Sequence, residues 1–399
     1  MSRLEELIQE LCPDGVKYKK LGEIATDMYR GSGIKREQIT ATGTPCVRYG
    51  EIYTTYGIWF DKCVSHTDAS TVSSPKYFEH GDILFVITGE SVEDIAKSTA
   101  YVGHERCLAG GDIVVLKHEQ DPKYLSYALA TTNARKQKSS GKVKSKVVHS
   151  SVPAIKDIVI PVPPLPVQSE IVKILDNFAE LTAELTAELT AELTARRKQY
   201  EYYRDKLLTF DVLGGGTNKC NWRTLKEIAD IGTGSSNTNE GLDNGIYPFF
   251  VRSQEPLRKN EYEFDETAII TAGDGVGVGK VLHYVEGKYA LHQRAYRIHI
   301  KTPDVFPKYY FHYMQAMFLP YIQKSMFQGS VASIRRPMLN EFPVPIPPLS
   351  VQHRIVAILD RFDTLCNDLT SGLPAEIAAR QKQYEYYRDK LLTFKELTA

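Results

Sequence analysis

Two basic stretches contain the residues whose types and spacing could do chemistry in this chain. ARKQKSSGKVKSKVVHSS (134–151) has no acidic residue, and QGSVASIRRP (328–337) occupies the corresponding place in the second half. Lysine and arginine neutralise phosphates, and the backbone amides of a Gly-Ser pair can approach a phosphate closely. A solvated basic loop would explain either stretch alone, but the recurrence favours DNA binding. The candidate contacts are Lys138, Lys142, Lys144, Lys146, Ser330, Arg335 and Arg336.

A second pair of polar, glycine-rich turns lies near the start of each half. The two turns are MYRGSGIKREQ (28–38) and GTGSSNTNEG (232–241). Their side chains have the donor chemistry that base edges and phosphates accept, although a plain loop between strands explains either turn nearly as well. Together with two nearby arginines, they give the candidates Arg30, Lys35, Arg36, Arg48, Ser235, Ser236, Asn237 and Arg252.

Three stretches resemble enzyme motifs but lack the residues or the spacing that those motifs need. DIGTGS (230–235) resembles a methyltransferase cofactor loop, but no N-P-P-aromatic or D-P-P-aromatic motif follows it. GDGVGVGK (273–280) lacks both ends of a phosphate loop, and a tight hairpin turn explains it better. EDIAK (93–97) has the wrong spacing for a nuclease. We therefore predict no catalytic residue and a binding protein.

Composition narrows the class of protein further. Forty-nine basic and forty-nine acidic residues give a net charge of zero, so nucleic-acid affinity must come from local patches. The six cysteines lie far apart without clustered histidines, which predicts reduced thiols and no metal site. No signal peptide or membrane span is recognisable. These features predict a cytoplasmic protein with no membrane partner.

An internal repeat fixes the organisation of the chain. KQYEYYRDKLLTF occurs at 198–210 and again, unchanged, at 382–394. Upstream, PPLPVQSEIVKILDNF (163–178) corresponds to PPLSVQHRIVAILDRF (347–362) at the same offset of 184. The chain therefore contains two versions of one unit, each a variable globular part followed by a near-constant helix.

The first of these helices should run from about 167 to about 209, roughly 60 Å. Its middle contains FAEL and three TAEL units (182–193), whose leucines form one slanting stripe. The corresponding stripe of the second helix is interrupted at Gly372 and Pro374, which should break or kink it. We expect the two helices to pair antiparallel within one chain; a solvated helix or a homodimeric coiled coil is the alternative. The packing residues would be Leu181, Leu185, Leu189, Leu193, Leu365, Leu369 and Ile377.

The globular parts combine short strands with one helix each, expected at 121–137 and within FPKYYFHYMQAMF (306–318). The predicted fold class is α+β, with two mixed α/β domains separated by two long antiparallel helices and related by a pseudo-two-fold axis. The predicted boundaries are 1–160 and 213–345 for the domains, and 161–212 and 346–399 for the helices.

These motifs resemble a known family. The I-P-x-P-P-L-x-x-Q entry into each helix, the I-L-D-x-F start and the TAEL array are similar to the specificity subunit of type I restriction-modification systems, in particular its IC-like subgroup. The resemblance covers the whole chain, but it is weak in the globular parts.

The resemblance implies two target recognition domains, each recognising one half of an asymmetric, bipartite site in double-stranded DNA. The helices would be spacers that dock two modification subunits, with restriction (motor-nuclease) subunits completing the complex. It also implies no cofactor in this chain, S-adenosylmethionine in the modification subunit, and ATP and Mg in the restriction subunit. In this family the number of TAEL units changes the unspecified gap in the site. The alternatives from other classes are a coiled-coil scaffold without DNA specificity and an enzyme that acts alone.

Overall fold

The computed structural model describes residues 2–89, 95–138, 142–144, 147–210, 220–325, 333–368 and 370–397. The chain forms two compact units. Unit 1 comprises Met1–Ala187 and Ala378–Ala399, and unit 2 comprises Glu188–Ile377. No helix among the described residues is long and apolar enough to cross a membrane.

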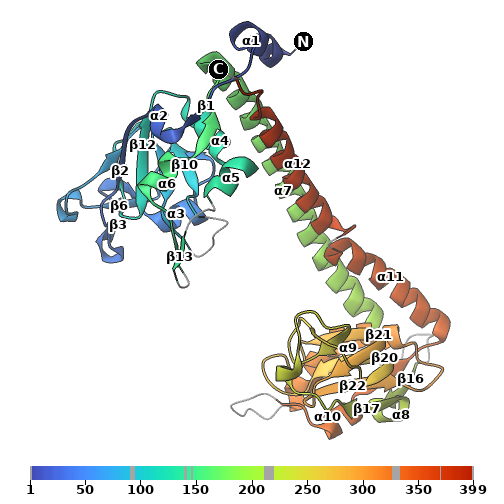
Figure 1. The fold of residues 1–399 in the computed structure, drawn as a ribbon. Helices are drawn as coiled ribbons and strands as arrows, with labels where there is room; N and C mark the ends of the chain where they lie inside the picture. Colours follow the sequence, from blue (N-terminus) through green and yellow to red (C-terminus); the bar gives the residue numbers. More distant parts are fainter. Residues whose placement is uncertain are drawn as a thin grey trace. The chain divides into compact units, whose positions relative to one another are not determined.

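Unit 1 begins with a short amphipathic helix and continues through short strands to the long helix α7 (Figure 1). Its helices are α1 (Arg3–Leu11), α2 (Leu21–Ile24), α3 (Tyr49–Thr54), α4 (Pro122–Leu129), α5 (Thr132–Lys138), α6 (Val152–Lys156), the first part of α7 (Leu165–Leu208) and the later part of α12 (Leu373–Leu391). Its strands are β1 (Tyr18–Lys20), β2 (Ala25–Arg30), β3 (Ile39–Thr40), β4 (Thr44–Val47), β5 (Trp59–Phe60), β6 (Ser65–Thr67), β7 (Tyr77–Phe78), β8 (Ile83–Val86), β9 (Thr88–Gly89), β10 (Ser98–Tyr101), β11 (Cys107–Ala109), β12 (Ile113–His118), β13 (Lys142–Lys144), β14 (Val147–His149) and β15 (Val159–Pro161).

The central sheet of unit 1 has the strand order β2-β12-β8-β10-β5, and a second sheet has the order β3-β6-β4-β11-β7. Alternate residues of β12 serve the two faces, as a strand requires. Val114 and Leu116 pack with Leu125 of α4, whereas Val115 packs with Val47 and the second sheet. The single helix expected at 121–137 is two helices, α4 and α5.

Unit 2 repeats this plan with longer strands. Its further helices are α8 (Leu225–Ile228), α9 (Pro307–Ser325), α10 (Arg336–Asn340), α11 (Leu349–Asn367) and the start of α12 (Leu373–Leu391). Its strands are β16 (Asn221–Thr224), β17 (Ala229–Thr233), β18 (Tyr247–Phe250), β19 (Leu257–Lys259), β20 (Phe264–Ala272), β21 (Leu282–Leu291), β22 (Ala295–Ile300) and β23 (Pro343–Ile346). The main sheet has the order β17-β22-β20-β21-β18-β19, and α9 packs on it through Tyr310 and Met314.

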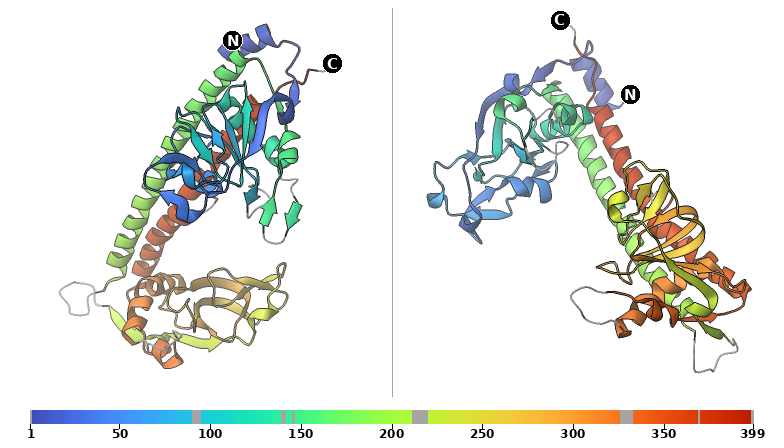
Figure 2. Two further views of the ribbon diagram at one scale, coloured as in Figure 1. Left: turned by 90° about the vertical axis from the view of Figure 1, so that its left-hand side faces the viewer. Right: turned by 60° about the horizontal axis from the view of Figure 1, so that its bottom comes forward.

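The repeated helical sequences pair within each unit. In unit 1, α7 lies alongside α12 (Figures 1 and 2), and the ring of Phe178 stacks on that of Tyr387 with centroids 6.2 Å apart. In unit 2, the later part of α7 pairs with α11, where Tyr203 stacks on Phe362 at 6.0 Å. Mixed α/β globular parts and a long helix from 165 to 208 confirm the predicted fold class.

The leucine stripe is only partly buried. Leu181 and Leu185 are 61% and 37% exposed, so neither side chain is fully covered. Leu189 and Leu193 are half-buried, as is Ile377, whereas Leu365 is exposed and Leu369 lies outside the described residues. Four residues rotate about 40° beyond one full turn of the helix, so each TAEL leucine lies further around the helix than the one before it.

The predicted break in the second helix is confirmed. Helix α11 ends at Asn367, and α12 begins at Leu373. A Cβ at Gly372 would lie 2.5 Å from Thr364 O, so only glycine fits there. Pro374 occupies the second position of α12, where its missing N–H would have no intrahelical partner in any case.

One buried glutamine fastens each constant helix to its globular part. The Nε2 of Gln168 donates to Pro163 O (2.7 Å), and its Oε1 accepts from Asp121 N (3.0 Å). In unit 2 the Nε2 of Gln352 donates to Pro347 O (2.7 Å), and its Oε1 accepts from Phe306 N (2.8 Å). The glutamine in the repeated P-P-L-x-V-Q motif is therefore structural.

Candidate nucleic-acid interface

In unit 1, three loops meet at one end of the central sheet. The loop after β2 joins the loop after β11, because Ser32 N donates to Ala109 O (2.9 Å). The loop after β4 joins the same place, because Gly110 N donates to Val47 O (2.9 Å). These backbone bonds fix the positions of the polar residues that follow each strand.

Unit 2 builds the same junction from different residues. Ser236 N donates to Leu291 O (3.3 Å), and His292 N donates to Phe250 O (2.9 Å). Ser32 and Ser236 occupy equivalent positions, and each forms an isolated parallel bridge with the first residue after the strand.

A fourth loop joins this end of the sheet in each unit. Ile87 N donates to Asp112 O (3.0 Å) in unit 1, and Gly273 N donates to Arg294 O (2.9 Å) in unit 2. The GDGVGVGK sequence therefore connects β20 to β21 by a long loop, and the prediction of a tight hairpin turn there is wrong. We call these four loops the loop end of each unit.

The loop end of unit 1 contains four of the candidates. Arg30 pairs with Asp112 (Nη2–Oδ1 2.6 Å), and Lys35 and Arg36 are exposed on the following loop. Arg48 donates to Glu51 (Nε–Oε1 3.3 Å) and, with Arg36, lines an open cleft of about 520 Å³. Two arginines with fixed carboxylate partners beside an open cleft can donate to an acidic or acceptor-rich ligand.

The candidates on the 232–241 turn have different surroundings. Ser235 is exposed, and its N donates to Glu263 (2.9 Å). Ser236 is buried and bonds Glu263 and Lys259, so this hydroxyl stabilises the loop and does not face outward. Asn237 is exposed and accepts from the side-chain amide of Gln293.

Arg252 lies directly at the loop end of unit 2. Its Nη1 is 2.7 Å from Asp274 Oδ1, and Arg294 approaches the other oxygen of Asp274 at 3.1 Å. The sequence had not marked Asp274, Arg294 or Asp112 as candidates. The repeat could have located them, because each follows a strand that has a counterpart in the other unit.

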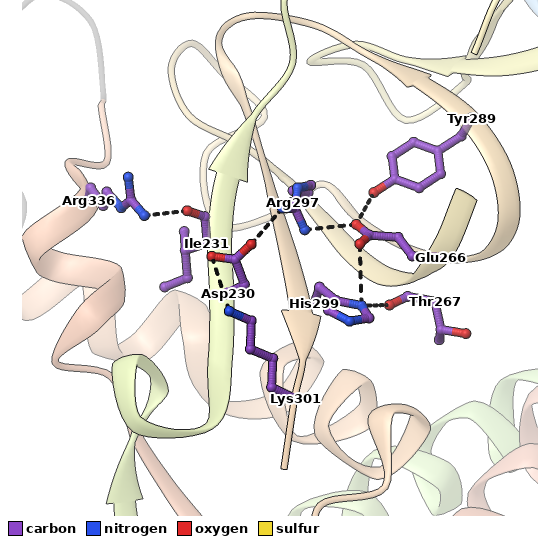
Figure 3. A network of polar contacts seen from close by, with 9 residues as sticks. All are labelled: Asp230, Ile231, Glu266, Thr267, Tyr289, Arg297, His299, Lys301 and Arg336. Atoms are coloured by element: carbon purple, nitrogen blue, oxygen red, sulfur yellow. Dashed lines mark hydrogen bonds and ion pairs between the residues drawn. The ribbon is translucent and has the colours of Figure 1, made fainter. Parts of the chain in front are cut away.

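Arg335 and Arg336 are both exposed at the start of α10. The Nη2 of Arg336 donates to Ile231 O (2.5 Å), which ties α10 to β17 (Figure 3). The figure also shows Arg297 between two carboxylates, 2.6 Å from Asp230 and 2.8 Å from Glu266. The bond from Arg297 lowers the pKa of Asp230, so this carboxylate stays ionised and binds Arg297 across the sheet, beside the strands that lead into the loop end.

Lys138 is not on the surface, which corrects its assignment as a phosphate contact. Its side chain is buried, and its Nζ donates to Ser98 Oγ (3.0 Å). The side chains of Lys142 and Lys144, and all of Lys146 and Ser330, lie outside the described residues. Among the described residues, no group of three or more His, Cys, Asp or Glu could hold a metal ion.

Comparison with known proteins identifies the family that has this architecture. The family model of the type I restriction modification DNA specificity domain matches residues 13–195 and 219–379, once in each half. The chain belongs to this family. The specificity subunit of the type I restriction enzyme EcoR124I/EcoR124II from Escherichia coli is 38% identical over 266 residues. That match covers 60% of this chain and 63% of the relative, so the chain aligns with less than two thirds of that relative's length.

Solved structures agree on the fold of this type I specificity protein. A chain from a structural study of complex assembly and conformational transition of the type I restriction-modification system superposes with a TM-score of 0.71 at 16% identity. It covers 96% of this chain and 98% of that one. The HsdS subunit from Thermoanaerobacter tengcongensis gives 0.57 at 16% identity, with 96% of both chains covered.

Proposed function

We propose that this chain is the DNA sequence-recognition subunit of a type I restriction-modification complex, with each globular part recognising one half of an asymmetric, bipartite site in double-stranded DNA. The observation that carries the proposal is the pair of loop ends. Both have the same backbone hydrogen bonds, but they present different side chains. A repeated frame with divergent polar residues is what two half-sites of different sequence require.

The constant helices are the proposed docking surfaces for two modification subunits. Tyr386 is 61% exposed beside Tyr387, whose ring stacks on Phe178 in unit 1. The repeated pair at 202–203 is similarly exposed beside Phe362 in unit 2. Exposed tyrosines on a rigid helix are typical of the centres of protein interfaces. The same local surface in both units supports one modification subunit for each.

In this proposal the chain has no catalytic activity and binds no cofactor. S-adenosylmethionine belongs to the modification subunits, and ATP and Mg belong to restriction subunits that complete the complex in the cytoplasm. The candidate that competes with this proposal is a coiled-coil scaffold without DNA specificity. The two arginine-rich loop ends favour the DNA-recognition subunit, because a scaffold has no need of them.

Methyl transfer by the complex with its modification subunit tests the proposal. Random-sequence duplexes and labelled S-adenosylmethionine should give methylation at one asymmetric, two-part motif. Deleting one TAEL unit (residues 190–193) should shorten the gap by one or two base pairs, because four helical residues contribute about 6 Å and a base-pair step about 3.4 Å. Methylation that does not need this chain, or a gap that ignores the number of TAEL units, would contradict it.

A further inference from the structure

One carboxylate holds two arginines at the loop end of unit 2. Asp274 follows β20, Arg252 lies two residues after β18, and Arg294 lies immediately before β22. The three residues meet although they are far apart in sequence, with Nη1–Oδ distances of 2.7 Å for Arg252 and 3.1 Å for Arg294. Each guanidinium uses one of its five N–H donors on Asp274 in this way.

Asp274 is a charged partner for both arginines. Burial alone would raise the pKa of Asp274, but the bonds and charges of Arg252 and Arg294 outweigh burial, so the pKa is lowered. The carboxylate is therefore ionised at neutral pH and binds both cations. Its side chain is 20% exposed, and both of its oxygens are engaged.

The arginines remain open to a ligand. The side chain of Arg294 is 63% exposed and that of Arg252 is 40% exposed. Arg252 and Asp274 line an open cleft of about 400 Å³, together with Val276, which is 97% exposed at the tip of its loop. A loop whose apolar tip stands in solvent projects away from the body of the unit.

We propose that Arg252 and Arg294 recognise a guanine in the half-site of unit 2, with Asp274 as the positioning residue. In the major groove guanine presents two acceptors, O6 and N7, whose spacing matches the fork of a guanidinium. An arginine held by a carboxylate keeps its remaining donors in a planar fork, which matches the paired acceptors on the edge of a guanine. This inference rests on the proposed function and names the base that one domain selects.

Unit 1 explains why the choice of base would differ between domains. Asp112 occupies the position of Arg294, since the same backbone bond identifies both residues. Thr88 follows Ile87 as Asp274 follows Gly273. Unit 1 thus has an acid where unit 2 has an exposed arginine. The arginine that pairs with this acid is Arg30, the last residue of β2.

Arg-to-Lys variants separate base recognition from contact with phosphate. Lysine keeps the positive charge but loses the planar fork, so Arg294→Lys and Arg252→Lys should retain methylation while relaxing the preference at one guanine about 5- to 100-fold. Arg223→Lys is the matched control, because Arg223 also pairs with an acid in unit 2 (Asp304, 2.8 Å) but lies on β16, outside the loop end. The complex that contains Arg223→Lys should methylate the same DNA motif as the unsubstituted protein. Asp274→Asn should relax the same base pair, since only a positioning role predicts that coincidence.

A modified base gives a second, independent measurement. Replacing that guanine by 7-deazaguanine removes N7 and should slow methylation by the unsubstituted protein about 5- to 100-fold. The same replacement should have little further effect on the lysine variant that has lost this contact. The inference is overturned if the lysine variants methylate the same motif as the unsubstituted protein, or if 7-deazaguanine at every guanine leaves methylation unchanged. The bipartite motif would still stand in either case. A complex that recognises no bipartite motif would instead refute the proposed function.

Discussion

At the scale of single residues, Lys138 gives a pH dependence that can be measured. Its Nζ lies 5.7 Å from the centroid of the Phe85 ring, and burial lowers the pKa of the amine to about 7. An unfolded lysine keeps its proton up to a pKa near 10.4, so between pH 7 and pH 10 the unfolded state binds more protons than the folded state. The free energy of unfolding of unit 1 should therefore rise by about 2 kcal/mol from pH 7 to pH 9.

Lys138→Met should remove this rise and stabilise unit 1 at pH 7, since no charge has to be buried. Chemical unfolding followed between pH 6.5 and pH 9 measures both effects. Lys136→Met is the control, because Lys136 is exposed on the same helix and should leave the slope in place. A wild-type slope that survives in Lys138→Met would show that another group titrates.

The same residue shows how far the sequence could predict the site. A basic run identifies charged side chains, but the turn of α5 that points Lys138 inward depends on tertiary packing. Arg252 was named only as one of the weaker candidates near the second polar turn. Asp274 and Arg294 were missed because only the folded sheet brings them to Arg252, and neither lies in a basic run.

At the scale of elements, the buried glutamines should fix the constant helices to the globular parts. Gln352→Ala removes the acceptor of Phe306 N and the donor to Pro347 O in a site from which water is excluded. Leaving such groups unsatisfied costs about 1–3 kcal/mol, so thermal unfolding of unit 2 should occur at a lower temperature. Gln254→Ala, at an exposed loop position, should have no such effect. Equal unfolding temperatures for both variants would mean that the glutamine is dispensable.

Most of the helices and strands could be predicted, because the repeat presents the same sequence pattern twice. The long helix was expected at 167–209 and is found at Leu165–Leu208. The face that it buries was not predictable from leucines alone. Thr182 and Thr186 are half-buried while Leu181 and Leu185 are exposed, because the position of the partner helix decides which stripe is covered.

At the scale of the whole molecule, the chain contains the same architecture twice, with additional elements in one copy. The two copies share the strand that enters the sheet, the tyrosine bonds Tyr124 OH to Pro161 O and Tyr309 OH to Pro345 O, and the loop-end bonds. Unit 1 is the longer copy, and its additions include α3 and β5, which have no counterpart among the described residues of unit 2. The two copies therefore keep a common framework and differ in the elements added to it.

Residues from opposite ends of the sequence close the globular part of unit 1. Unit 1 uses both ends of the sequence, because Val16 N donates to Lys395 O (2.9 Å) and Leu397 N donates to Val16 O (3.0 Å). Tyr18 OH reinforces the junction by donating to Phe394 O (3.1 Å). The residues after α12 thus complete the first globular part from the far end of the chain.

Deleting residues 393–399 should therefore destabilise unit 1 by about 2–4 kcal/mol, from the lost hydrogen bonds and the packing of Phe394, and leave unit 2 unchanged. Hydrogen exchange gives the clearest measurement, because the amide of Val16 should lose its protection while that of Leu225, bonded to Phe342 O in unit 2, keeps it. Lys395→Ala is the matched control: it removes a side chain but retains the backbone carbonyl that Val16 uses. Protection of Val16 that survives the deletion would mean that the tail only lies against unit 1. Loss of that protection in the deletion alone would make the tail a structural part of unit 1.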